Sequence, residues 1–345
     1  MTWARGYNGP AMPVSVRSFA KINLGLAIGA KRDDGFHELR TIYQTIALHD
    51  VVRVDVSRGS GIEIRCKDPR VPCDETNTCW RMADRVMKAF KQRGKVVIQI
   101  EKNLPVQGGI GGGSSNAVAT LFGLERALKA ELAPGERLRL AAEVGSDLPL
   151  FLVGGTVLGC GRGEEVYPLP DLPSVACVIA TPSVAVSTPE AFRQWDEFRQ
   201  QQDDKELTPA AQSNTISEFS RSAFGWLSGT LSGVPAAVDS GKEAKAGARG
   251  DRAETLLLDL VRAGIENDFE RVVFPKYPEL REVKRLLERN QSSYASLSGS
   301  GSTLYGLYAA APLAEKAAEA LRQQAVPAVA TSTLSRTAYL EQRFV

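Results

Sequence analysis

The chain has 345 residues, of which 43% are hydrophobic and 24% charged, and 42 basic against 40 acidic residues give a formal charge of +2. Such a composition is typical of a globular protein that buries its core without disulfides or a structural metal. A balanced charge with no basic block argues against a nucleic-acid partner. The five scattered cysteines form no CxxC pair and only two histidines occur, so no zinc site is expected and the thiols suit a reducing cytoplasm. No apolar stretch is long enough to cross a membrane.

The first half of the chain mixes strand and helix patterns. Apolar residues alternate from Val16 to Ile28, which predicts a strand whose other face carries Lys21 and Asn23, roughly 7 Å apart. A helix is expected to begin at Asn77 or Thr78, and a second helix follows a glycine-rich stretch. Further strands are expected at Thr41–Leu48, Val51–Val56, Ile62–Cys66 and Val96–Glu101.

In the middle of the chain, Glu136–Val144 is predicted as a helix that stops at Gly145. Gly145–Pro149 is predicted as a turn, because the residue before a proline avoids helical geometry. Strands are expected at Gly155–Gly159 and Val175–Ala180. From about 200 to 252 the composition shifts to Gln, Asp, Ser, Gly, Ala and Lys, which predicts a partly disordered surface insertion.

After the insertion, strands and helices are again mixed, which indicates an α+β domain with an antiparallel sheet. The expected elements are helices at Thr255–Phe269, Pro278–Glu288 and Leu313–Gln323, a strand entering the loop Ser298–Ser302, a strand at Thr303–Tyr308, and one or two final strands.

The strongest motif is the run from Leu104 to Ala117, in which five of the six positions from Gly108 to Gly113 are glycine. With so few side chains, the backbone amides can close around an anion, and the following helix adds its positive end. Ser114 and Ser115 could donate to phosphate or hold magnesium. No Gly-Lys-Ser/Thr closes the run, and the G-x-G-x-x-G spacing fails at Ser114, so neither a Walker A loop nor a dinucleotide site is supported. A plain strand-to-helix turn would need only one or two glycines.

Three other features each have a plain structural alternative. The small-residue run Ser298–Thr303 is either a hairpin or a second phosphate-type loop, and two such loops favour a nucleotide on one side and a phosphorylated or acceptor group opposite. Asp147 is either the N-cap of a short helix or a carboxylate that accepts the proton of an attacking hydroxyl. Lys21 is either a solvated strand lysine or the cation that lowers the pKa of that hydroxyl. Together with the glycine run, these features predict an ATP-dependent kinase that phosphorylates a hydroxyl of a soluble metabolite.

Three segments together resemble the GHMP small-molecule kinase superfamily. They are Ala20-Lys-Ile-Asn-Leu24 with Asp34-Gly-Phe-His-Glu-Leu39, the glycine-rich run, and Gly145-Ser-Asp-Leu-Pro149 with Ser298-Gly-Ser-Gly301. The likeness covers most of the chain, except the tail before about Val14 and the insertion. It implies an α+β two-domain GHMP kinase fold. A ribosomal protein S5 domain 2-like N-terminal domain would span 14–181, and a ferredoxin-like C-terminal domain would span 182–345 with the insertion at about 200–252.

Within the superfamily, the first segment resembles the members that act on a cytidine diphosphate-linked methylerythritol. The reaction implied is transfer of the ATP γ-phosphate to its 2-hydroxyl, in the non-mevalonate (methylerythritol phosphate) route to isoprenoid precursors. Matching positions imply Lys21 and Asp147 as the catalytic pair, with Asp147 as base, and Asn23 as a substrate contact. The resemblance further implies that the cytosine is read by one imidazole and stacked on two phenyl rings: His37, Phe36 and Phe192. The family usually has Tyr where Phe36 stands, and Phe36 can stack but lacks the hydroxyl.

The same resemblance implies ATP and Mg²⁺ as cofactors, with no metal-ligating residue assigned. Asn77 and Lys102 would lie near the adenine. The phosphates would be wrapped by Pro105, Val106, Gln107, Gly108, Gly109, Ile110, Gly111, Gly112, Gly113, Ser114 and Ser115. The expected partner is the small-molecule acceptor, with neither nucleic acid nor membrane, for a cytoplasmic monomer or weak homodimer.

Three alternatives remain open. Another superfamily member would act on homoserine, mevalonate or a sugar, but Asp34–Leu39 would have no purpose there. A catalytically silent nucleotide sensor would be expected to lose Lys21 or Asp147, and both are present. A dinucleotide oxidoreductase is disfavoured by the glycine spacing.

Overall fold

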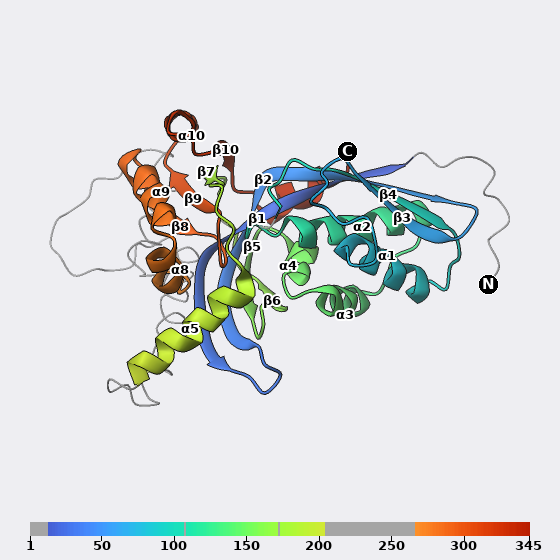
Figure 1. The fold of residues 1–345 in the computed structure, drawn as a ribbon. Coiled ribbons are helices and arrows are strands. Elements are labelled where there is room, and N and C mark those ends of the chain that lie inside the picture. The colour runs from blue at the N-terminus through green and yellow to red at the C-terminus, as the bar shows by residue number, and fades with distance from the viewer. Residues whose placement is uncertain (1–12, 107, 172, 204–265) are drawn as a thin grey trace.

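A long antiparallel pair of strands, β1 (Val14–Lys31) and β2 (His37–Ser57), runs between the two halves of the molecule (Figure 1). The computed structural model describes residues 13–106, 108–171, 173–203 and 266–345. Residues 18–28 of β1 are all buried, so the polar face that carries Lys21 and Asn23 also lies inside the protein. The register pairs Asn23 with Tyr43 on β2.

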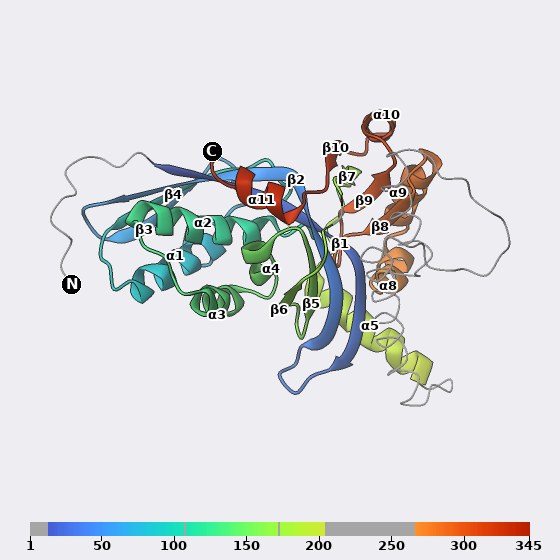
Figure 2. The same ribbon diagram turned by 180° about the vertical axis from the view of Figure 1, so that it is seen from behind.

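The first half is a six-stranded sheet with helices on one face. The strand order is β3-β4-β2-β5-β6, with β1 paired to β2, and only β3 and β4 run parallel. Its other strands are β3 (Gly61–Cys66), β4 (Lys95–Glu101), β5 (Thr156–Cys160) and β6 (Glu165–Pro168). The helices are α1 (Thr78–Ala89), α2 (Gly112–Leu128), α3 (Pro134–Val144) and α4 (Leu148–Val153), and Figures 1 and 2 show them gathered on the same side of the sheet. Apolar residues of α1 and α2 share one core with β2 and β4, in which α1 packs on α2 and α2 packs on β1 and β2.

The second half is a four-stranded antiparallel sheet in the order β10-β7-β9-β8. Its strands are β7 (Ala176–Ala180), β8 (Tyr294–Leu297), β9 (Leu304–Tyr308) and β10 (Ala328–Ser332). Its helices are α5 (Thr188–Asp203), α8 (Glu270–Lys276), α9 (Pro278–Arg289) and α10 (Ala311–Gln323). Leu26 and Ile28 of β1 belong to the core of this half, so the long strand contributes to both cores.

The chain ends with α11 (Arg336–Gln342), which lies over the large sheet in Figure 2. Ser335 caps the helix, since its side chain accepts from the Ala338 N–H at 3.2 Å. Tyr339 packs against Phe19 of β1. In the described part of the chain, no helix is long and apolar enough to span a bilayer.

Several expected elements differ in detail. The predicted strands Thr41–Leu48 and Val51–Val56 are one strand, β2. Of the predicted helix Thr255–Phe269, residues 255–265 lie outside the described residues, as does most of the predicted insertion, and 266–269 are not helical, because Asn267 forms a bridge with Leu26. The prediction of one or two final strands is right for β10, but α11 follows it. The division into domains at 181 stays a prediction.

Candidate active site

The ammonium of Lys21 is held inside the protein by a chain of hydrogen bonds along β1 and β2. Lys21 is 2% exposed, and its Nζ donates to Asn23 Oδ1 at 2.7 Å. Asn23 Nδ2 in turn donates to Thr41 Oγ1 at 2.7 Å, and that hydroxyl donates to the Gly25 carbonyl at 2.7 Å. The alternative of a solvated strand lysine is therefore wrong. A buried ammonium with fixed orientation can neutralise a developing negative charge.

Asp147 lies opposite this ammonium. Its Oδ2 is 3.3 Å from Lys21 Nζ, and its side chain is 35% exposed, so it is accessible from the cavity. Asp147 occupies the N-cap position of α4, but its side chain makes no capping hydrogen bond. The carboxylate is thus oriented toward Lys21 and is not used to cap the helix, and of the two readings of Asp147 the carboxylate role is the one this geometry favours.

Tyr43 completes the arrangement around Asp147, and the sequence reasoning missed it. Its hydroxyl donates to Asp147 Oδ1 at 3.1 Å, and Lys21 Nζ is 5.4 Å from the centre of its ring. Burial, followed by the charge of Asp147, raises the pKa of Tyr43 well above its ordinary value, so the hydroxyl stays protonated and donates. Only the register of β1 and β2, which pairs Tyr43 with Asn23, could have revealed this residue.

The glycine-rich loop brings the N-terminus of α2 to the same place. The backbone N–H of Lys21 donates to the Ile110 carbonyl at 3.0 Å, which ties the loop to β1. Gly111, the N-cap of α2, has a φ of 72°, and a Cβ on it would lie 2.8 Å from the ring of Phe151 and 3.1 Å from Lys21 Cγ. Only glycine fits here, because both the conformation and the space exclude a side chain.

The remaining loop residues divide into two groups. Gly109, Gly111 and Ser114 line the cavity that holds Lys21 and Asp147. Ser115 is buried and its Oγ accepts from Ser18 at 2.8 Å, so that hydroxyl is directed away from the cavity. Gln107 lies outside the described residues. The other predicted phosphate-loop residues belong to the same loop but are not among those lining this cavity: Pro105, Val106, Gly108, Ile110, Gly112 and Gly113.

Asn77 and Lys102 also lie outside this cavity. Asn77 caps α1, since its Oδ1 accepts from the Cys79 N–H at 2.8 Å while its Nδ2 donates to the Pro72 carbonyl. Lys102 pairs with buried Asp50 at 2.6 Å, next to Gly112. Their predicted position near the adenine stays a prediction.

The far end of the cavity is aromatic. The ring of His37 is stacked on Phe192, with centroids 4.9 Å apart and planes 11° from parallel, and its Nε2 lies 2.6 Å from Asp196 Oδ1. The rings of Phe192 and Phe269 lie edge to face, with their centroids 4.9 Å apart. Phe36 is 51% exposed at the rim. The structure therefore brings together the three ring residues predicted from the sequence and adds Asp196 and Phe269 to them.

A second loop, Ser298–Ser302, packs directly against the glycine-rich loop. Gly299 and Ser300 line the cavity, whose volume is about 710 Å³. Ser298 Oγ donates to the Gly109 carbonyl at 3.1 Å, and the Thr303 N–H donates to the Gly108 carbonyl at 3.2 Å. The two loops thus contact each other directly beside the cavity, and the ligand that the second loop faces stays a prediction.

Comparison with known proteins identifies this arrangement. The models of the GHMP kinase N-terminal and C-terminal domains match residues 77–155 and 252–327. A 4-diphosphocytidyl-2-C-methyl-D-erythritol kinase of Solibacter usitatus is 37% identical over 85% of this chain and 80% of its own length, and one of Acaryochloris marina is 34% identical over 91% and 92%. The chain belongs to the 4-diphosphocytidyl-2-C-methyl-D-erythritol kinase family. It is accordingly a GHMP kinase, a phosphotransferase with an alcohol as acceptor.

Solved structures agree with this membership. A crystal structure of 4-(cytidine 5'-diphospho)-2C-methyl-D-erythritol kinase has a TM-score of 0.67 at 27% identity and covers 92% of this chain and 98% of its own. A homoserine kinase from Cytophaga hutchinsonii has a TM-score of 0.68, but at 17% identity it shares the fold alone. The family and the α+β GHMP kinase fold predicted from the sequence are both confirmed.

Proposed function

We propose that the protein transfers the γ-phosphate of ATP to the 2-hydroxyl of 4-diphosphocytidyl-2-C-methyl-D-erythritol, giving ADP and the 2-phosphate. The observation that carries the proposal is one continuous cavity. At one end, Lys21 and Asp147 lie 3.3 Å apart beside the N-terminus of α2, and at the other end His37 and Phe192 form an aromatic wall. A phosphate donor fits the first end and a cytosine fits the second.

In the proposed mechanism the residues mainly position the two substrates and neutralise negative charge on the phosphates. Backbone N–H groups of the glycine-rich loop hold the ATP phosphates, and Lys21 neutralises charge on the transferring group. Asp147, held by Tyr43 and Lys21, takes the proton of the attacking hydroxyl. At the cytosine end, Asp196 fixes the ring of His37 against the base, and Phe36 offers an open face for stacking.

Magnesium fits this site as a companion of ATP. Mg²⁺ usually keeps waters and phosphate oxygens and takes only one or two protein oxygens. The Ser114 side chain lines the cavity and would supply one, whereas in the described residues no group of three acidic, His or Cys side chains could form an all-protein cage. When bound, the ion would neutralise charge on the phosphates.

The test is ADP release and phosphorylated-product formation with ATP, magnesium and the cytidine diphosphate-linked acceptor. Asp147→Asn keeps the shape but removes the base, so kcat should fall by about 100- to 10,000-fold. Lys21→Met should lower kcat on a similar scale. Asp84→Asn, which removes a carboxylate on α1 paired with Lys88, is the matched control and should keep kcat. Turnover of homoserine or mevalonate in place of this acceptor would overturn the substrate assignment, and ATP binding without turnover of any acceptor would indicate a silent sensor.

A further inference from the structure

The short segment before α8 runs beside β1, close to the residues of the active site. The Leu26 N–H donates to the Glu266 carbonyl at 2.9 Å, and the Asp268 N–H donates to the Leu26 carbonyl at 2.9 Å. Asp268 Oδ2 also accepts from the Ile28 N–H at 2.9 Å. These bonds hold Asn267 next to the strand that carries Lys21 and Asn23.

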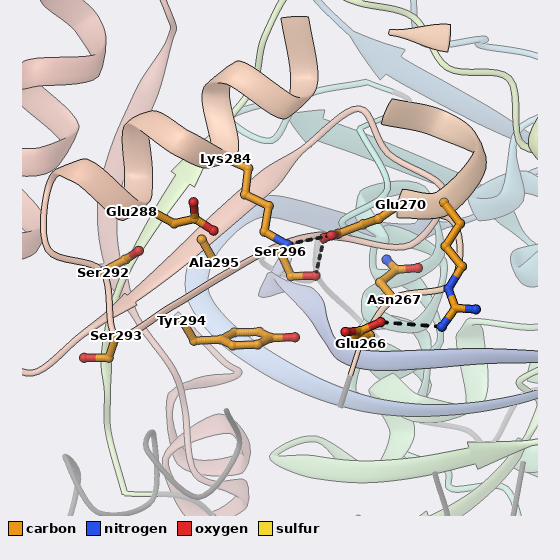
Figure 3. A pocket seen from close by; sticks show the side chains of 11 residues that line it. Glu266, Asn267, Glu270, Lys284, Glu288, Ser292, Ser293, Tyr294, Ala295 and Ser296 are labelled. Atoms are coloured by element: carbon orange, nitrogen blue, oxygen red, sulfur yellow. Dashed lines mark hydrogen bonds and ion pairs between the residues drawn. The ribbon is translucent and has the colours of Figure 1, made fainter. Parts of the chain in front are cut away.

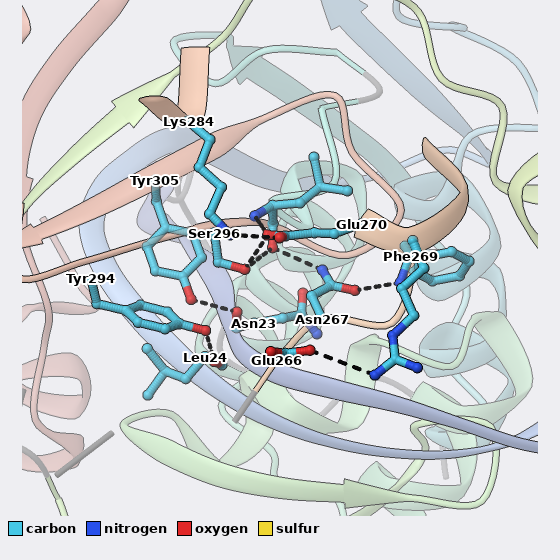
Figure 4. Close-up of polar contacts among 12 residues, drawn as sticks. Asn23, Leu24, Glu266, Asn267, Phe269, Glu270, Lys284, Tyr294, Ser296 and Tyr305 are labelled. Atoms are coloured by element: carbon cyan, nitrogen blue, oxygen red, sulfur yellow. Dashed lines mark hydrogen bonds and ion pairs between the residues drawn. The ribbon is translucent and has the colours of Figure 1, made fainter. Parts of the chain in front are cut away.

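The side chain of Asn267 joins this segment to the second loop. It is 2% exposed, and Nδ2 uses both of its hydrogens, one to the Leu297 carbonyl and one to the Gly299 carbonyl, each at 2.8 Å. Figure 4 shows this side chain beside Phe269. Its Oδ1 accepts from the Phe269 N–H at 3.1 Å. A buried amide with both hydrogens used in this way fixes the end of β8 and one point of the loop that follows.

Those two points determine where the loop meets the proposed catalytic pair. Gly299 lies against Lys21 and Asn23, since a Cβ on it would be 3.7 Å from Lys21 Nζ and 3.6 Å from Asn23 Oδ1. A shift of Gly299 would therefore change the space beside the ammonium. Asn267 itself is not among the residues that line the active-site cavity, so its influence passes through the loop.

Hydrogen bonds also hold β8, the strand that leads into this loop. Among the described residues, a second cavity of about 450 Å³ lies on this side, and Figure 3 shows Asn267, Glu270 and Ser296 around it. Glu270, paired with Lys284 at 2.6 Å, accepts from Ser296 Oγ at 2.8 Å and from the Leu297 N–H at 2.9 Å. Glu270 and Asn267 thus both hold the end of β8, and Asn267 also holds the turn that follows.

We propose that Asn267 is a positioning residue for phosphoryl transfer. Its amide keeps the Ser298–Ser302 loop in the position in which Gly299 stays against Lys21 and Asn23. The inference rests on the proposed function, because the role it assigns is a role in that reaction.

Asn267→Asp is the sharpest variant, because the new side chain keeps the shape and the acceptor for the Phe269 N–H but offers no hydrogen to the two carbonyls. Misplacing groups at a reacting centre by about 1 Å can cost about 100-fold. We expect kcat per mole of folded enzyme to fall about 10- to 100-fold, with the KM values for ATP and acceptor within about threefold of the natural protein. Asn290→Asp is the matched control. It removes an amide hydrogen bond to the Leu286 carbonyl at the end of α9, and kcat should not change.

A pH series separates positioning from simple destabilisation. A carboxyl between two carbonyl oxygens is favoured in its protonated form, which can donate to one of them. Relative to the natural protein, kcat of Asn267→Asp should therefore recover as the pH falls from about 8 to about 6, while Asn267→Ala should show no recovery. Loss of stability alone would lower the folded fraction but not kcat per folded molecule.

Hydrogen exchange of the peptide 294–303 provides a readout that does not need turnover. Exchange should be faster in Asn267→Asp and unchanged in Asn290→Asp. If the natural protein does not phosphorylate the acceptor, the proposed function fails. Unchanged hydrogen exchange in Asn267→Asp would instead show that the amide of Asn267 does not hold the loop. If the natural protein is active and Asn267→Asp has the same kcat, the positioning role is overturned.

Discussion

A buried ion pair joins β2 to the chain that enters the glycine-rich loop. Lys102 Nζ lies 2.6 Å from Asp50 Oδ2, with the two side chains 8% and 0% exposed. The other oxygen of Asp50 accepts from the Asn103 and Leu104 N–H groups, each at 2.7 Å. At an effective dielectric constant of about 20, charges at this separation attract by about 6 kcal/mol, which the desolvation of both groups partly offsets.

Asp50→Asn isolates this pair, since the amide oxygen can still accept from both backbone N–H groups. It leaves the Lys102 ammonium buried without a carboxylate, which should lower the free energy of unfolding by about 3–5 kcal/mol. Lys102→Met leaves the Asp50 carboxylate with two backbone N–H donors, so it should lower the free energy of unfolding by less than Asp50→Asn does. The double variant should be more stable than the sum of the two single losses predicts, by about 2 kcal/mol. Urea unfolding followed by circular dichroism measures all four proteins, and losses that add to within about 0.5 kcal/mol would refute the reasoning.

The same variants test the predicted place of Lys102 near the adenine. If Lys102 contacts the nucleotide, KM for ATP should rise in Lys102→Met and in the double variant to the same extent. If Lys102 only supports the loop through Asp50, KM should rise less in the double variant than in Asp50→Asn. The ATP dependence of ADP release distinguishes the two.

Three further outcomes follow from the geometry of the described residues. Asp196→Ala, which frees the ring of His37, should raise KM for the acceptor about tenfold but leave KM for ATP unchanged in steady-state kinetics. Gly111→Ala should cut kcat/KM for ATP more than tenfold, because its methyl group would meet a phenyl ring at 2.8 Å. Burial raises the pKa of Cys79 to about 12, so its thiol stays protonated at pH 8. Mass spectrometry after brief alkylation of the folded protein should find exposed Cys73 modified and buried Cys79 intact. Unfolding should make Cys79 reactive as well.

Strands and helices could be predicted where the spacing of apolar residues along the segment matches the face that the segment buries. Strand alternation located β1, and the helical stripe after Asn77 located α1. Joining the two predicted strands into β2 depended on pairing with β1 on both sides of the register shift near Phe19, which no local pattern records. Likewise, α11 was missed because its burial is provided by residues such as Phe19, which is distant in sequence.

The residues of the site also divide into those that could be predicted from the sequence and those that could not. Lys21, Asp147 and the glycine-rich loop lie in motifs typical of phosphoryl transfer, so they could be proposed from the sequence. Tyr43 and Asp196 could not, because each acts through a partner supplied by another element, Asp147 in one case and His37 in the other. A tyrosine in a strand and an aspartate in a helix have no distinguishing sequence pattern before those partners are placed.

The position of the site follows from the length of β1. Near its middle the strand carries Lys21 and Asn23, and a few residues later Leu26 and Ile28 pack into the core of the other half. The first half supplies the N-terminus of α2, while the second half supplies Gly299, so both approach the same ammonium. Because one continuous strand fixes this ammonium relative to both cores, a small displacement of either loop changes the reacting geometry directly. The hydrogen bonds that Asn267 donates to the Leu297 and Gly299 carbonyls would limit such a displacement of the second loop, which is the positioning role proposed for it.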